Sequence, residues 1–541
     1  MEDDVGSGSL DLRGRDGLFD ALGARTFDVI VIGGGITGAG VARDAAMRGL
    51  SVALVEARDF GSGASSRSSK MIHGGLRYLP MGDIALVREA ASERKIVQAI
   101  APHLARETPF VIPAKTGGTI AKLRAGLWTF EKLGGVPKSR KHEVWSLAEL
   151  EANEPAIAAT GLAGAVVYPE YLTDDARLTL ANVRGAADHG AVVANYCAAE
   201  AILTENGRAT AVTVRETLPG APVRTARVSG RMIVNAAGPW VDAVRALEAP
   251  GATGRLKLTK GVHLVVPREK LPVSRTIIFP AADRRSVFAV PKGETTYIGT
   301  TDTFHPTTED WPEITAQDAD YLLTAAAAWF SVSPLTRVDI ASAWSGVRPL
   351  VAEEGKSASD ISRKDELWTG PAGVLSIAGG KLTAFRKMAE RVVDQIEEAL
   401  GRKLSKSRTA TDPLPGGDVD VAAMTASLVA AGVSPEAAAR SVGLYGSEVE
   451  AVGNGAAAEA TYAVLYEGAL TLEDYWVRRG ARAWFDLDPA FPALDAAAEV
   501  MAPLLGWSAA ARQNQINHCR ALRSDALSNL RAEQPLGAET A

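Results

Sequence analysis

Residues 27–40 read FDVIVIGGGITGAG and decide the first part of the fold. The apolar run 27–33 is typical of a strand that is buried on both faces of a parallel sheet. A helical pattern follows in ITGAGVARDAAMRGL, and a second apolar run, SVALVEA, comes after it. Because strand, helix and strand in this order form a βαβ unit, we expect a right-handed crossover between two adjacent parallel strands.

Three glycines of this stretch, Gly33, Gly35 and Gly38, form a GxGxxG motif between the strand and the helix. The first permits a tight turn, the second lets backbone N–H groups approach a pyrophosphate, and the third allows close helix–strand packing. Glu56 ends the second strand, where its carboxylate can accept hydrogen bonds from an adenosine ribose. The motif therefore predicts a dinucleotide site; the alternative is a glycine-rich turn that binds no ligand.

Two later segments favour FAD over a nicotinamide cofactor. VNAAGPW (234–240) ends a strand near Gly238, and IAGGKLTAF (377–385) repeats the order of strand, glycine pair and helix start. Ligands of doubly wound sheets lie beyond the carboxyl ends of the strands, so both segments would reach one long cofactor. The helix that begins near Leu382 would direct its positive end toward the flavin pyrimidine. Ordinary strand–helix turns are the alternative.

The chain has 541 residues, more than one hydrophobic core of about 250–300 residues holds, so we expect several domains. GVHLVVP, SVFAVP and TTYIGTTD predict an antiparallel sheet, and alanine-rich periodic segments after a Pro/Gly-rich stretch predict a helical domain. The predicted fold is α/β (α+β overall), with a Rossmann-like FAD-binding domain, an antiparallel-sheet substrate domain and a C-terminal helical domain. The expected division is a disordered tail (1–24), a discontinuous FAD-binding domain (25–80, 170–255 and 340–401), an interleaved substrate domain (81–169 and 256–339), a linker (402–418), the helical domain (419–531) and a tail (532–541).

Composition excludes several classes of protein. The net charge of −6 argues against a broad nucleic-acid surface. Cys197 and Cys519 lie far apart and form no CxxC, so we expect neither a disulfide framework nor a metal site. The acidic, glycine-rich start has no signal-peptide pattern, and no apolar run reaches the roughly 18 residues that span a bilayer. We therefore expect a cytoplasmic protein whose membrane contact is peripheral.

Eight sequence blocks follow one another along the chain: DVIVIGGGITGAG, SSKMIHGGLRYL, TDDARLTLAN, VNAAGPW, KGVHLVVP, IGTTD, SGVRPL and GGKLTAFRKMAE. In this order and approximate spacing they resemble the FAD-dependent (aerobic, respiratory) glycerol-3-phosphate dehydrogenase family. The resemblance is close over about 27–400 and looser in the helical domain. It implies oxidation of sn-glycerol 3-phosphate to dihydroxyacetone phosphate, with electrons passing from reduced FAD to membrane quinone. Thr37 replaces the usual Asn, and Ala384-Phe385 replaces the more common Thr-Tyr.

The resemblance also implies where the substrate phosphate binds. Arg77, Arg348 and Arg363 match family blocks, and an arginine fork can bind two phosphate oxygens at once. Tyr78 would donate a further hydrogen bond. For each arginine taken alone, a structural or surface ion pair is the alternative.

Removal of the substrate's hydroxyl proton requires a general base, for which histidine is the first choice near neutral pH. His263 matches the family position near the flavin, as base or as substrate ligand; a buried core histidine is the alternative. Lys381 is expected to neutralise the developing alkoxide or the reduced flavin. Arg348 is expected beside these catalytic groups, and Thr301 either lines the pocket with Asp302 or belongs to a β-turn.

The segment RSSKMIHGGLRYL (67–79) carries Lys70, His73 and Arg77 at the spacing of one helix face. Two glycines interrupt it and disfavour a helix, so we expect the backbone to pass close to the isoalloxazine ring here. The flavin contacts expected here and at the later strand ends are Ser68, Ser69, His73, Gly74, Gly238, Gly380, Lys381, Leu382 and Thr383.

Residues 115–141 contain seven Lys or Arg residues against Glu131 alone, and they include the apolar LWTF. Such a segment can rest on the anionic inner face of the cell membrane, near quinone; a solvated loop or helix is the alternative. The sequence leaves open whether the protein forms a homodimer. The related oxygen-using oxidases commonly carry an extra insertion, for which this chain shows no obvious room. Further alternatives are a flavin amine or amino-acid oxidase of the same fold and a non-catalytic FAD-binding protein.

Overall fold

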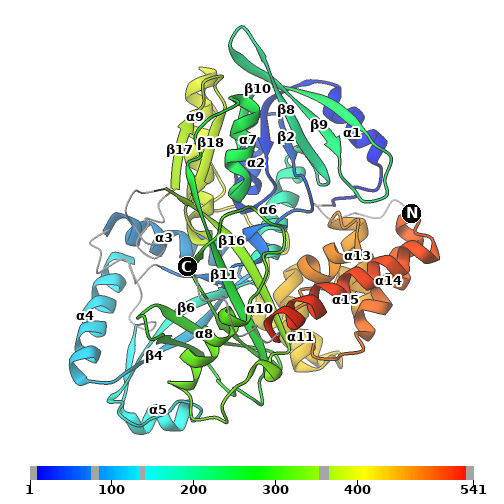
Figure 1. Cartoon of the computed structure of the whole chain (residues 1–541). Coiled ribbons are helices and arrows are strands. Elements are labelled where there is room, and N and C mark those ends of the chain that lie inside the picture. Colours follow the sequence, from blue (N-terminus) through cyan, green and yellow to red (C-terminus); the bar gives the residue numbers. More distant parts are fainter. Residues whose placement is uncertain (1–8, 75–83, 135–140, 353–364, 532–541) are drawn as a thin grey trace, which may run out of the picture.

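The computed structural model describes residues 9–74, 84–134, 141–352 and 365–531. Two β-sheets lie one above the other in Figure 1, and a group of helices from the last part of the chain flanks them on the right. The upper sheet contains the GxGxxG stretch, and the lower sheet contains most of the expected substrate domain. The two sheets meet around a cavity that is described below.

The upper sheet has the predicted parallel core. Its central strand β1 (Thr26–Ile32) is parallel to β2 (Val52–Val55) on one side and to β10 (Thr225–Asn235) on the other. Helix α2 (Ile36–Met47) connects β1 to β2, so the βαβ unit is confirmed. The order is β17-β18-β10-β1-β2-β7, and β8 and β9 extend it beside β10. The outer strands are β7 (Val192–Ala194), β8 (Cys197–Glu205), β9 (Arg208–Glu216), β17 (Asp365–Thr369) and β18 (Leu375–Gly379).

Helices cover both faces of this sheet because its central strands are apolar on both sides. On one face α2 packs against α6 (Asp175–Asp188) and α9 (Phe385–Leu400). Buried Val392 and Ile396 on α9 meet Val29 and Val31 of β1 in that core. On the other face, α1 (Arg15–Gly23) and α7 (Val241–Glu248) cover a core that contains Phe27.

The lower sheet has ten strands among the described residues, in the order β15-β11-β14-β13-β12-β4-β6-β3, with β16 beside β11 and β5 beside β6. Its pairs are antiparallel except β12 with β4, which confirms the predicted antiparallel sheet. Four helices accompany it: α3 (Ile84–Ile100), α4 (Gly117–Gly134), α5 (Leu147–Asn153) and α8 (Ala316–Ala327). The strands are β3 (Met71–Ile72), β4 (Ala105–Ala114), β5 (Glu143–Trp145), β6 (Gly164–Thr173), β11 (Leu256–Pro267), β12 (Thr276–Pro280), β13 (Ser286–Lys292), β14 (Thr295–Gly299), β15 (Thr303–Phe304) and β16 (Ser342–Val351).

Strands β3 and β16 belong to this lower sheet, although the expected division placed their residues with the FAD-binding domain. β3 also decides the conformation of the segment that begins at Arg67. Met71 pairs with Leu172, and Lys70 has a φ of 55°, so this part is extended rather than helical. Pairing with β6 outweighs the helical spacing of the polar residues.

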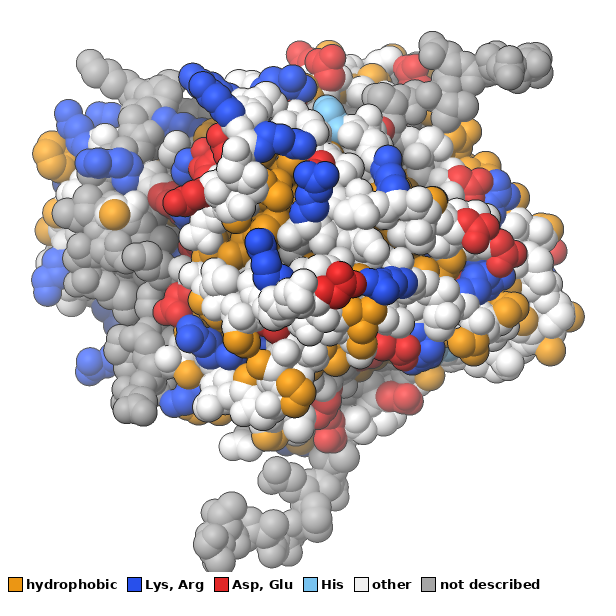
Figure 2. All heavy atoms as spheres, turned by 90° about the horizontal axis from the view of Figure 1, so that it is seen from above, with side chains coloured by type: hydrophobic (Ala, Val, Ile, Leu, Met, Phe, Trp, Pro, Cys, Tyr) orange, Lys and Arg blue, Asp and Glu red, His pale blue; other side chains and the backbone are white. Residues whose placement is uncertain are grey.

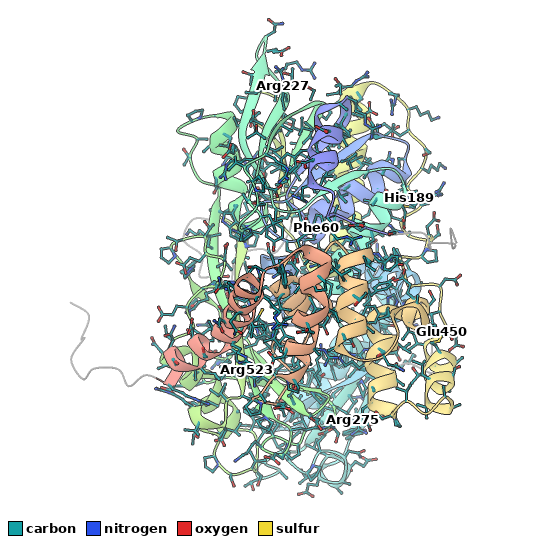
Figure 3. The ribbon with its side chains drawn as sticks, turned by 90° about the vertical axis from the view of Figure 1, so that its right-hand side faces the viewer. Phe60, His189, Arg227, Arg275, Glu450 and Arg523 are labelled. Atoms are coloured by element: carbon teal, nitrogen blue, oxygen red, sulfur yellow. The ribbon has the colours of Figure 1, made fainter. Side chains whose placement is uncertain are left out.

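The last part of the chain is helical, as predicted. Figure 3 shows these helices lying across the junction of the two sheets, with Phe60 of the upper part at their upper edge. Trp476 and Trp484 pack into a core with Tyr297 and Trp344 of the lower sheet. None of the described helices is both long and apolar enough to cross a membrane. The helices are α10 (Val421–Ala430), α11 (Pro435–Tyr445), α12 (Val449–Val452), α13 (Ala456–Tyr466), a π-helical segment η8 (Asp474–Arg479), α14 (Pro492–Leu505) and α15 (Ala509–Arg531).

Candidate active site

A cavity of about 1380 Å³ lies between the carboxyl ends of the upper strands and the lower sheet. Drug-sized ligands occupy pockets of about 300–1,000 Å³, so this cavity has room for a dinucleotide and a small substrate together. Its walls come from segments far apart in the chain: the ends of β1, β2, β10 and β18, the loop 57–69, part of β16 and one side of α4. The predicted convergence of strand ends on one cavity is therefore present.

The GxGxxG glycines form a cradle in which side chains have no room. A Cβ on Gly33, which has a φ of 109°, would lie 2.7 Å from the carbonyl oxygen of Ala236. A Cβ on Gly38 would lie 1.9 Å from the carbonyl oxygen of Gly33. Gly35 and the first turn of α2 line the cavity, so the positive end of this helix would favour a pyrophosphate bound there.

Glu56 lies at the end of β2 and lines the cavity. Its carboxylate accepts hydrogen bonds from the backbone N–H groups of Gly34 (2.6 Å) and Arg58 (2.9 Å). Desolvation by the surrounding protein raises the pKa of Glu56, and the two backbone bonds oppose that rise. A carboxylate has about four lone-pair sites, so acceptor capacity remains for ribose hydroxyls.

Ser68 and Ser69 line the cavity. Hydrogen bonds between their backbone and neighbouring residues fix their positions. The Asp175 carboxylate accepts hydrogen bonds from the Ser68 N–H (2.9 Å) and from Lys70 Nζ (2.6 Å). The Tyr297 hydroxyl donates to the carbonyl oxygen of Ser69 (3.1 Å). Sequence reasoning gave neither Asp175 nor Tyr297 a role in supporting this wall; the signals were the blocks TDDARL and TTYIGTTD, which contain them.

His263 lies one layer behind the cavity. Its ring stacks on Trp344 with a centroid separation of 4.6 Å, and Nε2 is 2.9 Å from Ser69 Oγ. The side chain is 1% exposed and is absent from the described lining of the cavity. Burial, together with the positive charges of Arg348 and Lys70, lowers the pKa of His263 well below its usual value. The imidazole is therefore neutral near pH 7 and reaches the cavity through Ser69.

Arg348 extends from β16 into the cavity lining. It forms an ion pair with Asp302 (Nη1–Oδ1, 3.1 Å) and donates to Thr300 Oγ1 (2.9 Å). Asp302 and Thr300 line the cavity too. Thr301 is buried. Its hydroxyl oxygen accepts a hydrogen bond from the N–H of Val262 (3.0 Å). In the turn IGTTD, Thr300 and Asp302 therefore line the cavity, whereas Thr301 is not among the described lining residues.

The strand end 377–383 lines the cavity with Gly380, Lys381, Leu382 and Thr383. Gly380 has a φ of 80°, and a Cβ there would lie 2.5 Å from the sulfur of Met388. Thr383 Oγ1 donates to the carbonyl oxygen of His73 (3.1 Å), which joins this turn to β3. His73 and Gly238 also line the cavity.

Gly74 has a packing role in the structure. Its N–H donates to the Glu170 carboxylate (3.0 Å), and a Cβ there would lie 2.3 Å from Cζ of Phe130 on α4. Arg77, Tyr78 and Arg363 lie outside the described residues.

Comparisons with known proteins agree with this geometry. The family model for FAD-dependent oxidoreductases matches residues 28–386, and the model for the C-terminal domain of alpha-glycerophosphate oxidase matches residues 407–512. The fold and the glycine cradle thus define a FAD-dependent oxidoreductase, and FAD is its cofactor. Within this class, the chain belongs to the FAD-dependent glycerol-3-phosphate dehydrogenase family.

Family membership rests on similarity over nearly the whole chain. The aerobic glycerol-3-phosphate dehydrogenase of Bacillus subtilis (strain 168) is 38% identical, over 95% of this chain and 97% of that protein. The Staphylococcus aureus (strain USA300) enzyme of the same name is also 38% identical, over 90% and 92%. The crystal structure of the Bacillus halodurans glycerol-3-phosphate dehydrogenase with FAD superposes with a TM-score of 0.80, at 31% identity, over 97% and 100% of the two chains.

Proposed function

We propose that this enzyme oxidises sn-glycerol 3-phosphate to dihydroxyacetone phosphate and passes the electrons to membrane quinone. FAD, when bound, supplies the hydride acceptor at flavin N5. The observation that carries the proposal is that the FAD cradle and the cationic Arg348 line one cavity. Relatives that span almost the whole chain bear the name aerobic glycerol-3-phosphate dehydrogenase.

The substrate phosphate binds at Arg348 in this proposal. A phosphate dianion requires paired charge and hydrogen-bond donors when it is buried. Asp302 orients the guanidinium, whose side chain is 23% exposed toward the cavity space. Lys381 also lines the cavity, and its positive charge would stabilise the negative charge that develops on the substrate oxygen. The resemblance to the family adds Arg77, Tyr78 and Arg363 to the proposed phosphate site.

The proton of the substrate hydroxyl passes through Ser69 to His263. Ser69 Oγ lines the cavity and lies 2.9 Å from Nε2 of His263. A dianion at Arg348 neutralises one of the charges that lower the pKa of His263, so substrate binding itself makes the imidazole a better base. Ser69→Ala and His263→Asn should both lower kcat and remove the same limb of its pH profile. An unchanged profile in either variant would contradict this route.

We also propose that α4 contacts the inner leaflet of the cell membrane. Its inner side, at Lys122 and Leu123, lines the cavity, while Arg124 and Trp128 on the helix are exposed, Trp128 by 55%. Figure 2 shows Lys and Arg side chains gathered along the left edge, the side on which α4 lies in Figure 1. Such a face attracts anionic lipid and inserts an aromatic anchor. Sedimentation with anionic liposomes should decline when Arg124 and Lys132 become Gln, and unchanged binding would rule this surface out.

The electron acceptor separates this proposal from a second candidate, an oxygen-using glycerol-3-phosphate oxidase. The match of the helical domain to the oxidase C-terminal model favours keeping that candidate. Steady-state turnover of sn-glycerol 3-phosphate with a soluble quinone analogue, and then with oxygen alone, decides between them. Fast turnover with the quinone and little with oxygen supports the dehydrogenase, and the reverse supports the oxidase. Amino acids as substrates in the same assay test the amino-acid oxidase alternative.

A further inference from the structure

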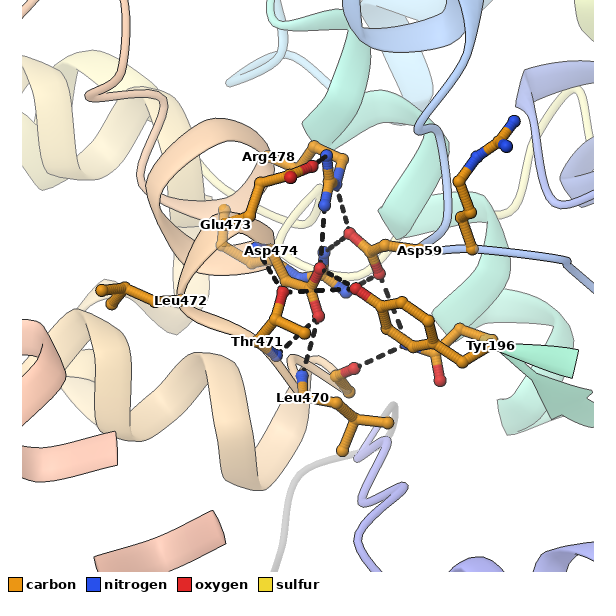
Figure 4. A network of polar contacts seen from close by, with 12 residues as sticks. Asp59, Tyr196, Leu470, Thr471, Leu472, Glu473, Asp474 and Arg478 are labelled. Carbon is orange, nitrogen blue, oxygen red and sulfur yellow. Dashed lines mark hydrogen bonds and ion pairs between the residues drawn. The ribbon is translucent and has the colours of Figure 1, made fainter. Parts of the chain in front are cut away.

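A buried charge network joins the helical domain to the loop 57–69, which we call the cofactor loop (Figure 4). Asp59 of this loop accepts hydrogen bonds from Arg478 and Arg479 of η8. One of them, from Arg479 Nη2 to Asp59 Oδ1, is 2.9 Å long. Asp59 is 0% exposed and the two arginines are 2% and 1% exposed.

Each member of the network has further partners. Arg478 also forms ion pairs with Glu473 (2.7 Å) and Asp474 (2.8 Å). Tyr196 donates its hydroxyl proton to Asp474 (2.7 Å), and Arg479 donates to the carbonyl oxygen of Glu467 (2.9 Å). Although burial raises it, the pKa of Asp59 is lowered overall by the two guanidinium groups. Asp59 therefore carries its negative charge at neutral pH.

The cofactor loop contributes much of one wall of the cavity. Ser62, Gly63 and Ser65 line it between Glu56 and Ser69. Ser65 Oγ accepts a hydrogen bond from the N–H of Ile36 at the start of α2 (2.9 Å). Phe60, next to Asp59, packs so closely on the glycine turn that a Cβ on Gly34 would lie 2.7 Å from its ring. The position of Asp59 therefore fixes the loop relative to the GxGxxG cradle.

We propose that the helical domain is a functional part of the FAD site: Arg478 and Arg479 are positioning residues that hold the cofactor loop in its FAD-binding conformation. None of the described residues of this domain lines the cavity, so the effect is transmitted through Asp59. A buried carboxylate that loses a cationic partner is strongly unfavourable, and a loop can relieve this by moving Asp59 toward water. Such a movement would take Ser62 to Ser65 away from the cofactor.

A matched pair of variants tests the proposal in the full-length protein. Arg479→Met removes one cation from Asp59. Arg184→Met removes a second buried arginine of the same junction, which pairs with Glu448 of the helical domain (2.7 Å). The protein is stripped of FAD, and FAD binding is then titrated by flavin fluorescence while thermal unfolding is recorded separately.

We expect Arg479→Met to raise the Kd for FAD by about tenfold or more and Arg184→Met to leave it within about twofold, although both variants lose thermal stability. Saturating FAD should restore turnover of Arg479→Met. If Arg479→Met does not fold, Arg479→Lys keeps the charge without the fork and should raise the Kd by a smaller factor. An unchanged Kd in the position-479 variant, or an equal rise in Arg184→Met, would overturn the proposal.

Discussion

Gly38 shows how a single residue fixes the cofactor site. A methyl group there would lie 1.9 Å from a backbone oxygen of Gly33, and backbone cannot move aside as a flexible side chain can. We expect Gly38→Ala to reduce bound FAD by about tenfold or more, measured as flavin absorbance per protein. Gly17→Ala in α1, where a Cβ meets nothing within 4 Å, is the control and should keep its FAD. Normal flavin content in Gly38→Ala would show that the cradle tolerates a side chain.

In the proposed reaction, Arg348 is the described residue that we expect to contribute most to substrate recognition. Hydrogen bonds to charged groups contribute about 1.5–3 kcal/mol, so Arg348→Ala should lower kcat/KM for sn-glycerol 3-phosphate by roughly ten- to hundredfold or more, mainly through KM. FAD content should be unchanged. Arg227→Ala, which removes an exposed arginine paired with Glu205, serves as the control. A normal KM in the Arg348→Ala variant would mean that the phosphate binds elsewhere in the cavity.

Local motifs carry the residues that could be predicted from sequence. Gly33, Gly38 and Glu56 lie within one βαβ unit, where spacing alone implies geometry. Asp175 could not be found this way, because it reaches Lys70 across 105 residues of sequence. The depth of His263 behind Ser69 also depends on packing against Trp344, which no periodicity describes.

At the scale of elements, pairing between distant segments decided what local patterns left open. The glycines correctly argued against a helix in 67–74, but they could not predict β3, because it forms by pairing with the distant β6. The parallel strands and the helices α2 and α9 were predictable because their apolar patterns are long and regular. The π-helical segment η8 was not, because its geometry depends on buried ion pairs with another domain.

The contact between α15 and η8 should make stability depend on pH. His518 Nε2 lies 2.7 Å from the Glu473 carboxylate, which raises the pKa of His518 above 6.5. A histidine whose pKa is raised on folding stabilises the protein fully below its unfolded pKa, and this contribution is lost as pH rises through the folded value. Although burial opposes the shift, the charge of Arg478 and the hydrogen bond from His518 lower the pKa of Glu473 to about 2, so the carboxylate stays charged throughout this range.

We therefore expect His518→Gln to lower the Tm at about pH 5.5 and to have almost no effect at about pH 9, with a difference on the order of 1 °C because the site is half exposed. Scanning calorimetry of both proteins at the two pH values measures this difference. An equal Tm change at both values would mean that the imidazole charge contributes nothing.

At the scale of the whole molecule, function depends on where three parts meet. The upper sheet supplies the FAD cradle, the lower sheet supplies Arg348 and the Ser69–His263 pair, and the helical domain holds the cofactor loop through Asp59. The existence of these parts could be predicted from sequence patterns. Their shared cavity could not, because it is formed by segments that only the tertiary fold brings together.

Anaerobic reduction of the flavin by sn-glycerol 3-phosphate is the decisive test of the proposed reaction. The purified enzyme is mixed under anaerobic conditions with less than one equivalent of sn-glycerol 3-phosphate, and both the flavin absorbance and the product are measured. We predict that the oxidised flavin spectrum bleaches and that one dihydroxyacetone phosphate forms for each flavin reduced. A flavin that stays oxidised, or one that bleaches without formation of dihydroxyacetone phosphate, would contradict the proposed reaction.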